Sequence, residues 1–304
     1  KMIMNPSPKS YLLAGFSSGL ILYTYALSYV VMPLFLLFVL IVMLRTKTLI
    51  LKHSHYFIIP LFLLALPLLL MVIINTFDYK SINILGFTIP KLPRYRGSGF
   101  TLSSMWFNLK YVIKSVFMYD QLTYNTFIRF FTLYKISIPF AILGIIKAFT
   151  DLTRTIKLKQ YNPITLFWLF ALSEFILGLI MIEQPNSNKL NGIFYSILVL
   201  VVYGIYWANE YLKKWIKSMR IIQIVQFLLV CLYGLNFISF SKYYYIEYKY
   251  DIYPQTLFTH TYSDELEYIN SRNQKNLKVF TENNIHSNYQ GDIYYRLSAK
   301  VSPY

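Results

Sequence analysis

Three cations stand close together in the longest polar interval of this chain, residues 75–125. They are Lys91, Arg94 and Arg96, and prolines and glycines flank them. Proline fixes the backbone and glycine permits sharp turns, so this segment can present the cations on a stiff loop. Arginine binds phosphate oxygens through paired hydrogen bonds, and lysine adds a point charge. The cluster predicts a phosphate site; the alternative is a solvated loop drawn to lipid headgroups.

Further polar residues are candidates for touching the rest of a substrate, namely Asn125, Glu174, Asn188 and Asn191. Glu174 stands in the middle of an apolar run, where an unpaired carboxylate is costly, so we expect it to face the protein interior. There it would serve as a relay group or as a packing partner. Asp120 is a catalytic candidate because it could orient a substrate hydroxyl, but it could equally cap or solvate a helix end.

Metal and nucleotide chemistry find little support in the sequence. His53 and His55 form a pair with one residue between them, but no third or fourth ligand lies nearby. Cys231 stands alone inside an apolar run, so we interpret it as a packing residue without an internal disulfide. Walker loops, dinucleotide fingerprints, nucleophile elbows and zinc spacings are not found.

The elements that must position these residues are membrane helices. The chain has 304 residues, of which 56% are hydrophobic and 14% charged, with a mean hydropathy of +0.44. A soluble domain would carry about 25% charge. The net charge is +16, and residues 1–242 hold 23 Lys and Arg against 6 acids. Because these cations flank apolar runs, we interpret them as topology signals that meet anionic lipid, and we expect no nucleic-acid partner.

Apolar runs near the ~20 residues that cross a bilayer recur along the chain. We expect a short helix at 11–27 and further helices at about 29–44, 56–74, 130–149, 163–182, 192–212 and 221–241. Gly15 and Gly19 in the first of these form a GxxxG spacing, which favours packing within the chain over a dimer. The expected fold is therefore an all-α polytopic membrane domain at 1–242, with about six or seven membrane helices.

The basic loops predict the orientation of these helices. Residues 45–55, 147–160 and 213–220 carry three or four Lys and Arg each, whereas 184–191 carries Lys189 alone. Alternation along the helices puts the three basic loops on one side, which the positive-inside rule makes cytoplasmic. The interval 75–125 and the tail from 243 then lie outside a plasma membrane.

Within the outer interval, residues 102–118 predict a helix lying in the membrane interface. Its apolar side chains share one helical stripe, namely Leu102, Met105, Trp106, Leu109, Ile113 and Val116. Asn108, Lys114 and Ser115 fall on the opposite face. This pattern is typical of a helix that covers a membrane domain from the interface.

The tail at 243–304 predicts a small extracytoplasmic module of α/β or α+β type. It has 6 Lys and Arg against 7 acids, a possible helix at 263–272, and strand-like patterns at 277–281 and 293–297. The module looks incomplete, and the chain looks like a fragment at both ends.

One long segment resembles a known family. Residues 14–47, AGFSSGLILYTYALSYVVMPLFLLFVLIVMLRTK, are similar to the GL-rich helix and the following span of GT-C membrane glycosyltransferases. These include protein O-mannosyltransferases and bacterial lipid A aminoarabinose transferases. The order of spans, interfacial helix, short Asn-containing outer loop (Asn186, Asn188, Asn191) and external C-terminal module is also similar.

This resemblance implies a bacterial cell-envelope enzyme that transfers a sugar from a polyprenyl-phosphate donor to an acceptor at the outer face. It implies a catalytic acid on a first outer loop, which would lie upstream of Lys1, and in some members a divalent metal. Lys91, Arg94 and Arg96 would contact the carrier phosphate. The alternatives are a flippase or other transporter of lipid-linked oligosaccharides, and an envelope polysaccharide polymerase or ligase.

Overall fold

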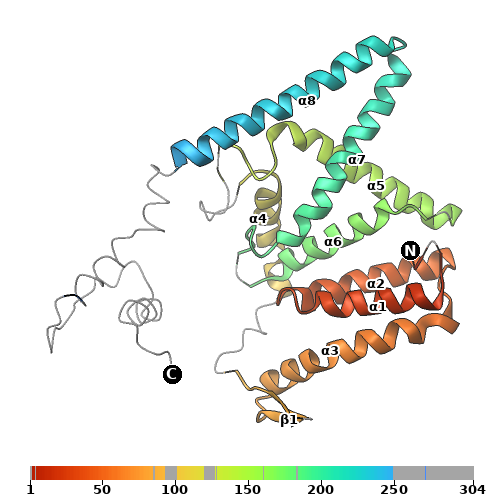
Figure 1. Cartoon of the computed structure of the whole chain (residues 1–304), viewed down its shortest axis with the longest axis vertical. Coiled ribbons are helices and arrows are strands. Elements are labelled where there is room, and N and C mark those ends of the chain that lie inside the picture. The colour runs from red at the N-terminus through yellow and green to blue at the C-terminus, as the bar shows by residue number, and fades with distance from the viewer. Residues whose placement is uncertain are drawn as a thin grey trace. The chain divides into compact units, whose positions relative to one another are not determined.

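The computed structural model describes residues 2–3, 5–84, 86–92, 101–119, 127, 129–159, 161–182, 184–248 and 271. In this part of the chain helices predominate, and the only sheet has two strands (Figure 1). The chain divides by its internal contacts into two units, Lys1–Gly234 and Leu235–Tyr304, and each is described by itself. The predicted boundary at 242 stays a prediction, and the helix and strands expected in the tail lie outside the described residues.

Within the described residues, five helical segments are long and apolar enough to cross a membrane. They are α2 (Ser28–Thr46), η1 with α3 (Leu51–His53 and Ser54–Thr76), η3 with α5 (Lys135–Ser137 and Ile138–Leu158), α7 (Asn191–Trp215), and α8 with η4 (Met219–Lys242 and Tyr243–Glu247). The apolar helix α6 (Ile164–Ile180) has 17 residues. Helix α1 (Pro8–Ile21) would be about 21 Å long, which is short of the ~30 Å hydrocarbon core. This is the architecture of a multi-pass membrane protein.

Polar and basic side chains define where these helices begin and end. The Ser7 side chain accepts a hydrogen bond from the Ser10 N–H at 3.2 Å, and the Ser10 side chain accepts one from the Ser7 N–H at 2.9 Å. This capping box starts α1. Helices α2 and α5 end at Lys47 and Lys159, both in the left-handed conformation with φ of 59° and 56°. A lysine there brings a cation to carbonyls that have no helical partner.

Helix α5 is displaced from its predicted position. The sequence predicts a span at 130–149 and a basic loop at 147–160, whereas α5 covers Ile138–Leu158 and includes Lys147, Arg154 and Lys157. The loop prediction is wrong because the segment keeps one buried face through Ala148, Asp151 and Thr155, while Arg154 and Lys157 are exposed.

The polar interval also contains a hairpin that the sequence analysis missed. Strands β1 (Ile82–Ile84) and β2 (Phe87–Ile89) pair antiparallel, with Ile82 opposite Ile89. Gly86 between them has a φ of +83°, a conformation that glycine adopts without strain. The short β-branched run on each side of a glycine was the available signal.

Helices α1 and α3 pack closely through two glycines. A side chain on Gly15 would overlap the Phe57 carbonyl, and a Cβ on Gly19 would lie 2.7 Å from Leu64 Cδ1. The GxxxG spacing thus serves packing within the chain, as predicted. Of the residues of α3, only Ile74 is buried. The side of α3 that faces away from α1 therefore has almost no protein neighbours.

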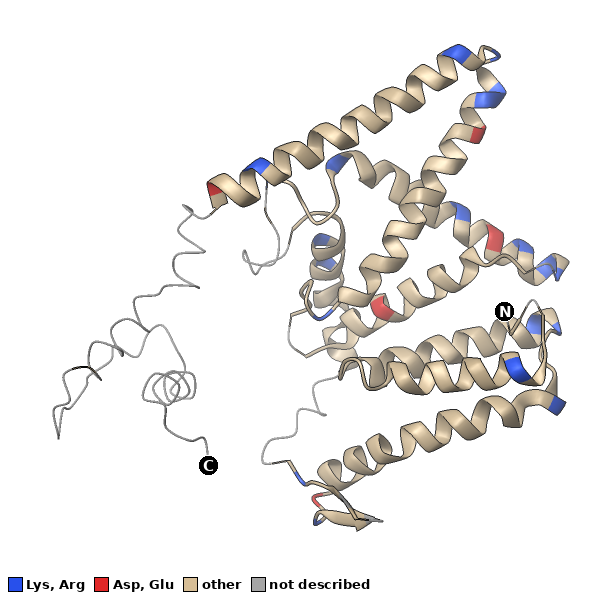
Figure 2. Cartoon of the chain, in the orientation of Figure 1, with Lys and Arg blue, Asp and Glu red and all other residues tan. Residues whose placement is uncertain are grey.

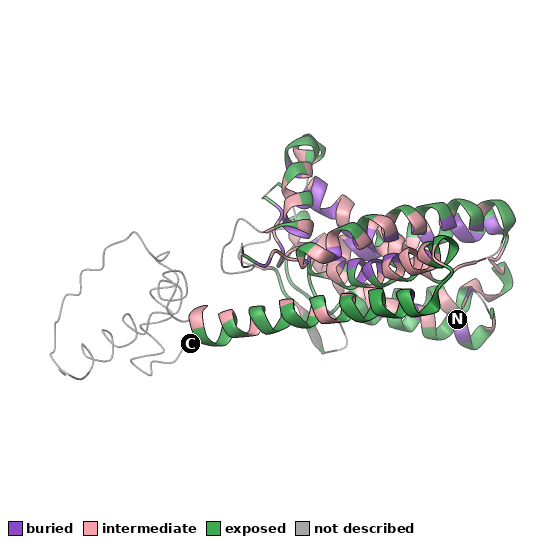
Figure 3. Ribbon diagram, turned by 90° about the horizontal axis from the view of Figure 1, so that it is seen from above, coloured by how far each residue is buried: buried purple, intermediate pink, exposed green. Residues whose placement is uncertain are grey.

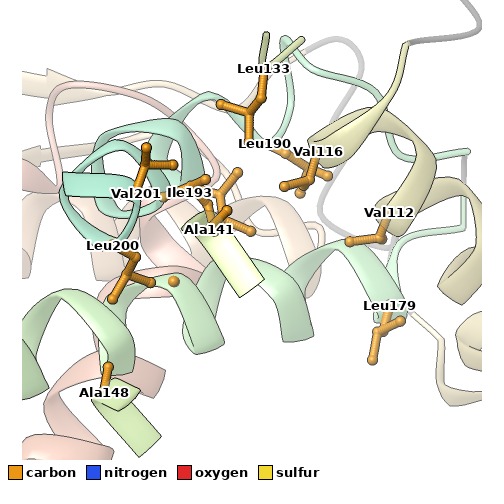
Figure 4. Close-up of a cluster of buried hydrophobic side chains, with 12 residues drawn as sticks. Val112, Val116, Leu133, Ala141, Ala148, Leu179, Leu190, Ile193, Leu200 and Val201 are labelled. Carbon is orange, nitrogen blue, oxygen red and sulfur yellow. The ribbon is translucent and has the colours of Figure 1, made fainter. Parts of the chain in front are cut away.

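Helices α5 and α7 cross even more closely. A Cβ on Gly144 would overlap the Leu200 carbonyl, and one on Gly204 would overlap the Phe140 carbonyl, so the two backbones touch. Around this crossing lies the largest group of buried apolar residues, drawn from α4 (Met105–Phe117), α5, α6 and α7 (Figure 4). Figure 3 shows buried residues concentrated among these helices, whereas α8 is exposed along nearly all its length.

Lysine and arginine gather at the helix ends. Figure 2 shows the α2–α3, α5–α6 and α7–α8 turns, with most of their cations, at the right-hand side of the first unit. The three basic segments therefore share one end, which we call the basic end. That this end faces the cytoplasm stays a prediction.

Candidate functional site

Helix α4 follows η2 (Leu102–Ser104) and lies at the end of the helices opposite the basic end. The predicted division of α4 into an apolar and a polar face is partly wrong. Asn108 and Ser115 of the polar face are buried, while Trp106 of the apolar stripe is 85% exposed. Leu102 and Ile113 are exposed as well. Of the apolar stripe, Val116 is buried in the core. Whether the helix lies in a membrane interface stays a prediction.

Asn108 is buried because it packs against the C-terminal end of α6. Its side-chain amide donates to the carbonyls of Leu179 at 3.1 Å and Met181 at 2.6 Å. The Thr101 N–H donates to the Ile180 carbonyl at 2.7 Å. The last carbonyls of a helix have no partner within it, so α4 and the residue before η2 satisfy those of α6. The exposed apolar stripe of α4 is left facing away from the protein.

A cavity of about 180 Å³ lies between α4, α5, α6 and α7. All of its lining side chains are apolar, and they include Val112, Ile113, Ile145, Ala171, Phe175 and Ile197. An apolar cavity of roughly 150 Å³ stays free of water and accepts a benzene-sized guest. This space can therefore hold part of an apolar chain, and none of the lining residues is charged.

Glu174 lies on α6 close to this cavity, two turns before the end of the helix. It is 6% exposed, which confirms that it faces the interior. A side chain on Gly192, in the first turn of α7, would overlap the Glu174 carboxylate, so the glycine provides the room for it. Within the described residues, no hydrogen bond or ion pair engages this carboxylate. A buried acid without a partner is a group free to hold a proton or a ligand.

Of the three predicted phosphate-binding cations, the structure places Lys91. Its ammonium lies 2.7 Å from Asp78, and both side chains are largely exposed. Asn75, at the end of α3, accepts a hydrogen bond from the Leu92 N–H at 2.6 Å and so fixes this segment beside α3. Arg94 and Arg96 lie outside the described residues, as do Asp120 and Asn125.

The two asparagines predicted in the short loop at 184–191 do not reach the cavity. Asn188 and Asn191 are both exposed. The loop is shaped by Asn186, whose side-chain oxygen accepts from the Lys189 N–H at 3.1 Å, and Ser187 is buried beneath it. Of the sequence-predicted site residues, the structure describes Lys91, Glu174, Asn188 and Asn191, and no hydrogen bond or ion pair joins any two of these four.

A polar cluster that sequence reasoning missed joins α5 to α7. The Asp151 carboxylate is 3.0 Å from the Lys147 ammonium, and it also accepts hydrogen bonds from the Tyr203 hydroxyl and the Asn162 amide. The Lys147 ammonium lies 4.0 Å from the centre of the Trp207 ring. We call these five residues the α5–α7 clasp. The i,i+4 spacings of Lys147 with Asp151 and of Tyr203 with Trp207 were the signals in the sequence.

Next to the clasp, the segment between α5 and α6 holds Tyr161, whose hydroxyl is buried without a hydrogen-bond partner. Burial raises the pKa of the Tyr161 phenol, so its neutral form is retained at all ordinary pH values. In the described part of the chain, no three His, Cys, Asp or Glu side chains come together in a way that could hold a metal ion.

No family model, curated protein or solved structure matches this chain. The class of protein that the described helices define is that of multi-pass membrane proteins.

Proposed function

We propose that this chain is the membrane portion of a glycosyltransferase that moves a sugar from a polyprenyl-phosphate donor to an acceptor at the outer face. The observation that carries the proposal is the wholly apolar cavity between α4 and α5–α7, next to a helix that turns an apolar stripe away from the protein. A donor with an apolar tail and a phosphate needs such a space close to an interface.

The polar groups around the cavity support the same assignment. Lys91 is fixed at the end of α3, on the side where α4 lies, and its partner Asp78 holds it in a surface ion pair. Exposed pairs of this kind are worth about 0–1 kcal/mol, so a phosphate can displace the carboxylate. Arg94 and Arg96 follow within five residues and would complete the grip. Glu174 is a buried acid on α6, between the cavity-lining Ala171 and Phe175, and could receive a hydroxyl of the sugar or acceptor.

A sugar-transfer assay tests the proposal. Vesicles containing the full-length protein would receive polyprenyl-phosphate hexoses, and transfer to acceptor material would be measured. We expect the double variant Arg94→Ala, Arg96→Ala to lose about tenfold or more in turnover, because charge-assisted phosphate contacts are lost. Lys80→Ala, which removes a cation from the same interval outside the cluster, is the control.

Two results would overturn the proposal. Undiminished turnover in the double variant would remove the phosphate grip. Movement of the lipid-linked sugar across the membrane without transfer would favour the flippase alternative.

A further inference from the structure

The α7–α8 turn carries a cluster of cations beside an exposed tryptophan. Trp215 ends α7 and is 86% exposed, and Lys213, Lys214, Lys217 and Arg220 lie within five residues of it. Trp side chains collect at the level of lipid headgroups, and cations there meet lipid phosphates. The turn therefore belongs at headgroup level.

Two of these cations are already engaged and two are not. The Lys213 ammonium lies 2.6 Å from Glu210, and that of Lys214 lies 5.4 Å from the centre of the Tyr211 ring. Within the described residues, no ion pair or hydrogen bond engages Lys217 or Arg220. These two side chains are exposed and are available to an anion.

From this turn α7 and α8 diverge (Figure 1). We call the region between them, where apolar side chains of both helices line a common space, the α7–α8 wedge. The wedge contains a cavity of about 390 Å³, lined by Ile205 and Leu212 of α7, Val225 and Leu229 of α8, and Phe140 of α5. At ~1.5 Å per residue, the stretch from Asn209 to Ile205 lies about 9–15 Å along α7 from Trp215. That depth below the headgroups is occupied by ester groups and acyl chains.

One polar pair stands in the lining of this cavity. The Gln226 amide of α8 donates to the Asn209 carbonyl oxygen of α7 at 2.8 Å. Within the described residues, no other hydrogen bond engages the Asn209 amide N–H groups or the Gln226 carbonyl oxygen, so they remain for other partners at the level where the ester groups of a phospholipid lie. Along the wedge the cations of the turn come first, and the amide pair then lies among the apolar lining residues.

We propose that the α7–α8 wedge binds one anionic phospholipid. Lys217 and Arg220 hold its phosphate, the Asn209–Gln226 pair faces its ester region, and its acyl chains fill the cavity. This site is separate from the cavity between α4 and α5–α7 and does not depend on the proposed transferase activity.

The test is lipid binding by the purified full chain in detergent, measured by native mass spectrometry with phosphatidylglycerol and phosphatidylcholine. The wild-type chain is expected to retain one phosphatidylglycerol in preference to phosphatidylcholine. Lys217→Gln with Arg220→Gln should weaken that binding about tenfold or more, since each Lys or Arg beside an anionic lipid surface strengthens binding about fivefold. Arg45→Gln with Lys52→Gln, an equal loss of charge on the α2–α3 turn, should not weaken it.

A second pair of variants tests the cavity. Leu229→Trp fills it and should also weaken phosphatidylglycerol binding, whereas Phe227→Trp, at a 68% exposed position outside the lining, should not. If the charge variants act and Leu229→Trp does not, the attraction is a surface effect and the proposal is overturned. It is equally overturned if wild type binds both lipids alike, or if Leu229→Trp instead dissociates a dimer of the chain.

Discussion

Two helix pairs in this molecule are joined by glycines, and they differ in what surrounds the contact. In the α1–α3 pair, Gly15 meets a backbone carbonyl and Gly19 meets the side chain of Leu64. In the α5–α7 pair, Gly144 and Gly204 both meet backbone carbonyls, and the buried clasp around Asp151 lies directly beyond them. Only 6% of the α3 span is buried, against 28% for α5 and 33% for α7.

This difference in burial shows that α1–α3 is a peripheral helix pair and α5–α7 a central one. Helix α3 touches protein on one side and turns the other outwards, which suits a lipid-facing position. The α5–α7 pair holds the buried Asp151 and borders both cavities. Where ionisable groups are buried among apolar helices, function or specificity is the usual reason for keeping them. The central pair therefore borders the cavity of the candidate site, whereas the peripheral pair does not.

The largest expected difference in stability between the two helix pairs comes from breaking the ion pair that lies beside each of them. Asp151→Ala should lower the free energy of unfolding by about 3 kcal/mol, because it leaves the largely enclosed Lys147 ammonium, whose side chain is 18% exposed, without its partner. Asp78→Ala breaks the exposed pair beside α3 and should cost less than about 1 kcal/mol. Unfolding in mixed micelles measures both values. Equal losses would mean that the clasp is no more buried than a surface pair.

The glycines should show a smaller difference of the same sign. Gly204→Ala forces two backbones apart and should cost about 3 kcal/mol, whereas Gly19→Ala displaces a flexible leucine side chain and should cost about 1 kcal/mol. The same micelle titration compares the two variants. A larger loss at Gly19 would contradict the assignment of α5–α7 as the tighter crossing.

The smallest effect tests the position of Glu174 within the central group. Gly192→Ala should cost about 2 kcal/mol in the wild-type background, because the new methyl group overlaps the carboxylate. In a Glu174→Ala background the same change should cost less than about 1 kcal/mol, since the overlap is gone. Additive losses in this double-mutant cycle would show that the carboxylate points away from α7.

Much of the helical architecture could be predicted because apolar length is a local property. Helices α2, α3, α7 and α8 lie close to their expected ranges. The end of α5 could not be predicted from charge, because Lys147 looks like a loop cation until its pairing with Asp151 is known. The burial of Asn108 depends on the carbonyls of α6, which are about 70 residues away in the chain. Such long-range pairings leave no local pattern.

The candidate site was predicted less well than the helices, for a similar reason. The interior position of Glu174 follows from the cost of an acid in an apolar run, and it is confirmed. Asn188 and Asn191 were chosen for their side-chain chemistry alone, and the turn formed by Asn186 leaves them exposed. The cavity could not be predicted, because it depends on how four helices meet.

The central claim is that the apolar cavity between α4 and α5–α7 receives the lipid tail of a sugar donor. The most direct measurement is sugar transfer by the full-length protein with donors of long and short polyprenyl chains. Ala171→Phe, which fills the cavity, should raise the KM for the long-chain donor about tenfold and leave the short-chain donor unaffected. Leu198→Phe, at an exposed position on α7 outside the cavity lining, is the control. Equal kinetics for both donors in Ala171→Phe and wild type would contradict the account.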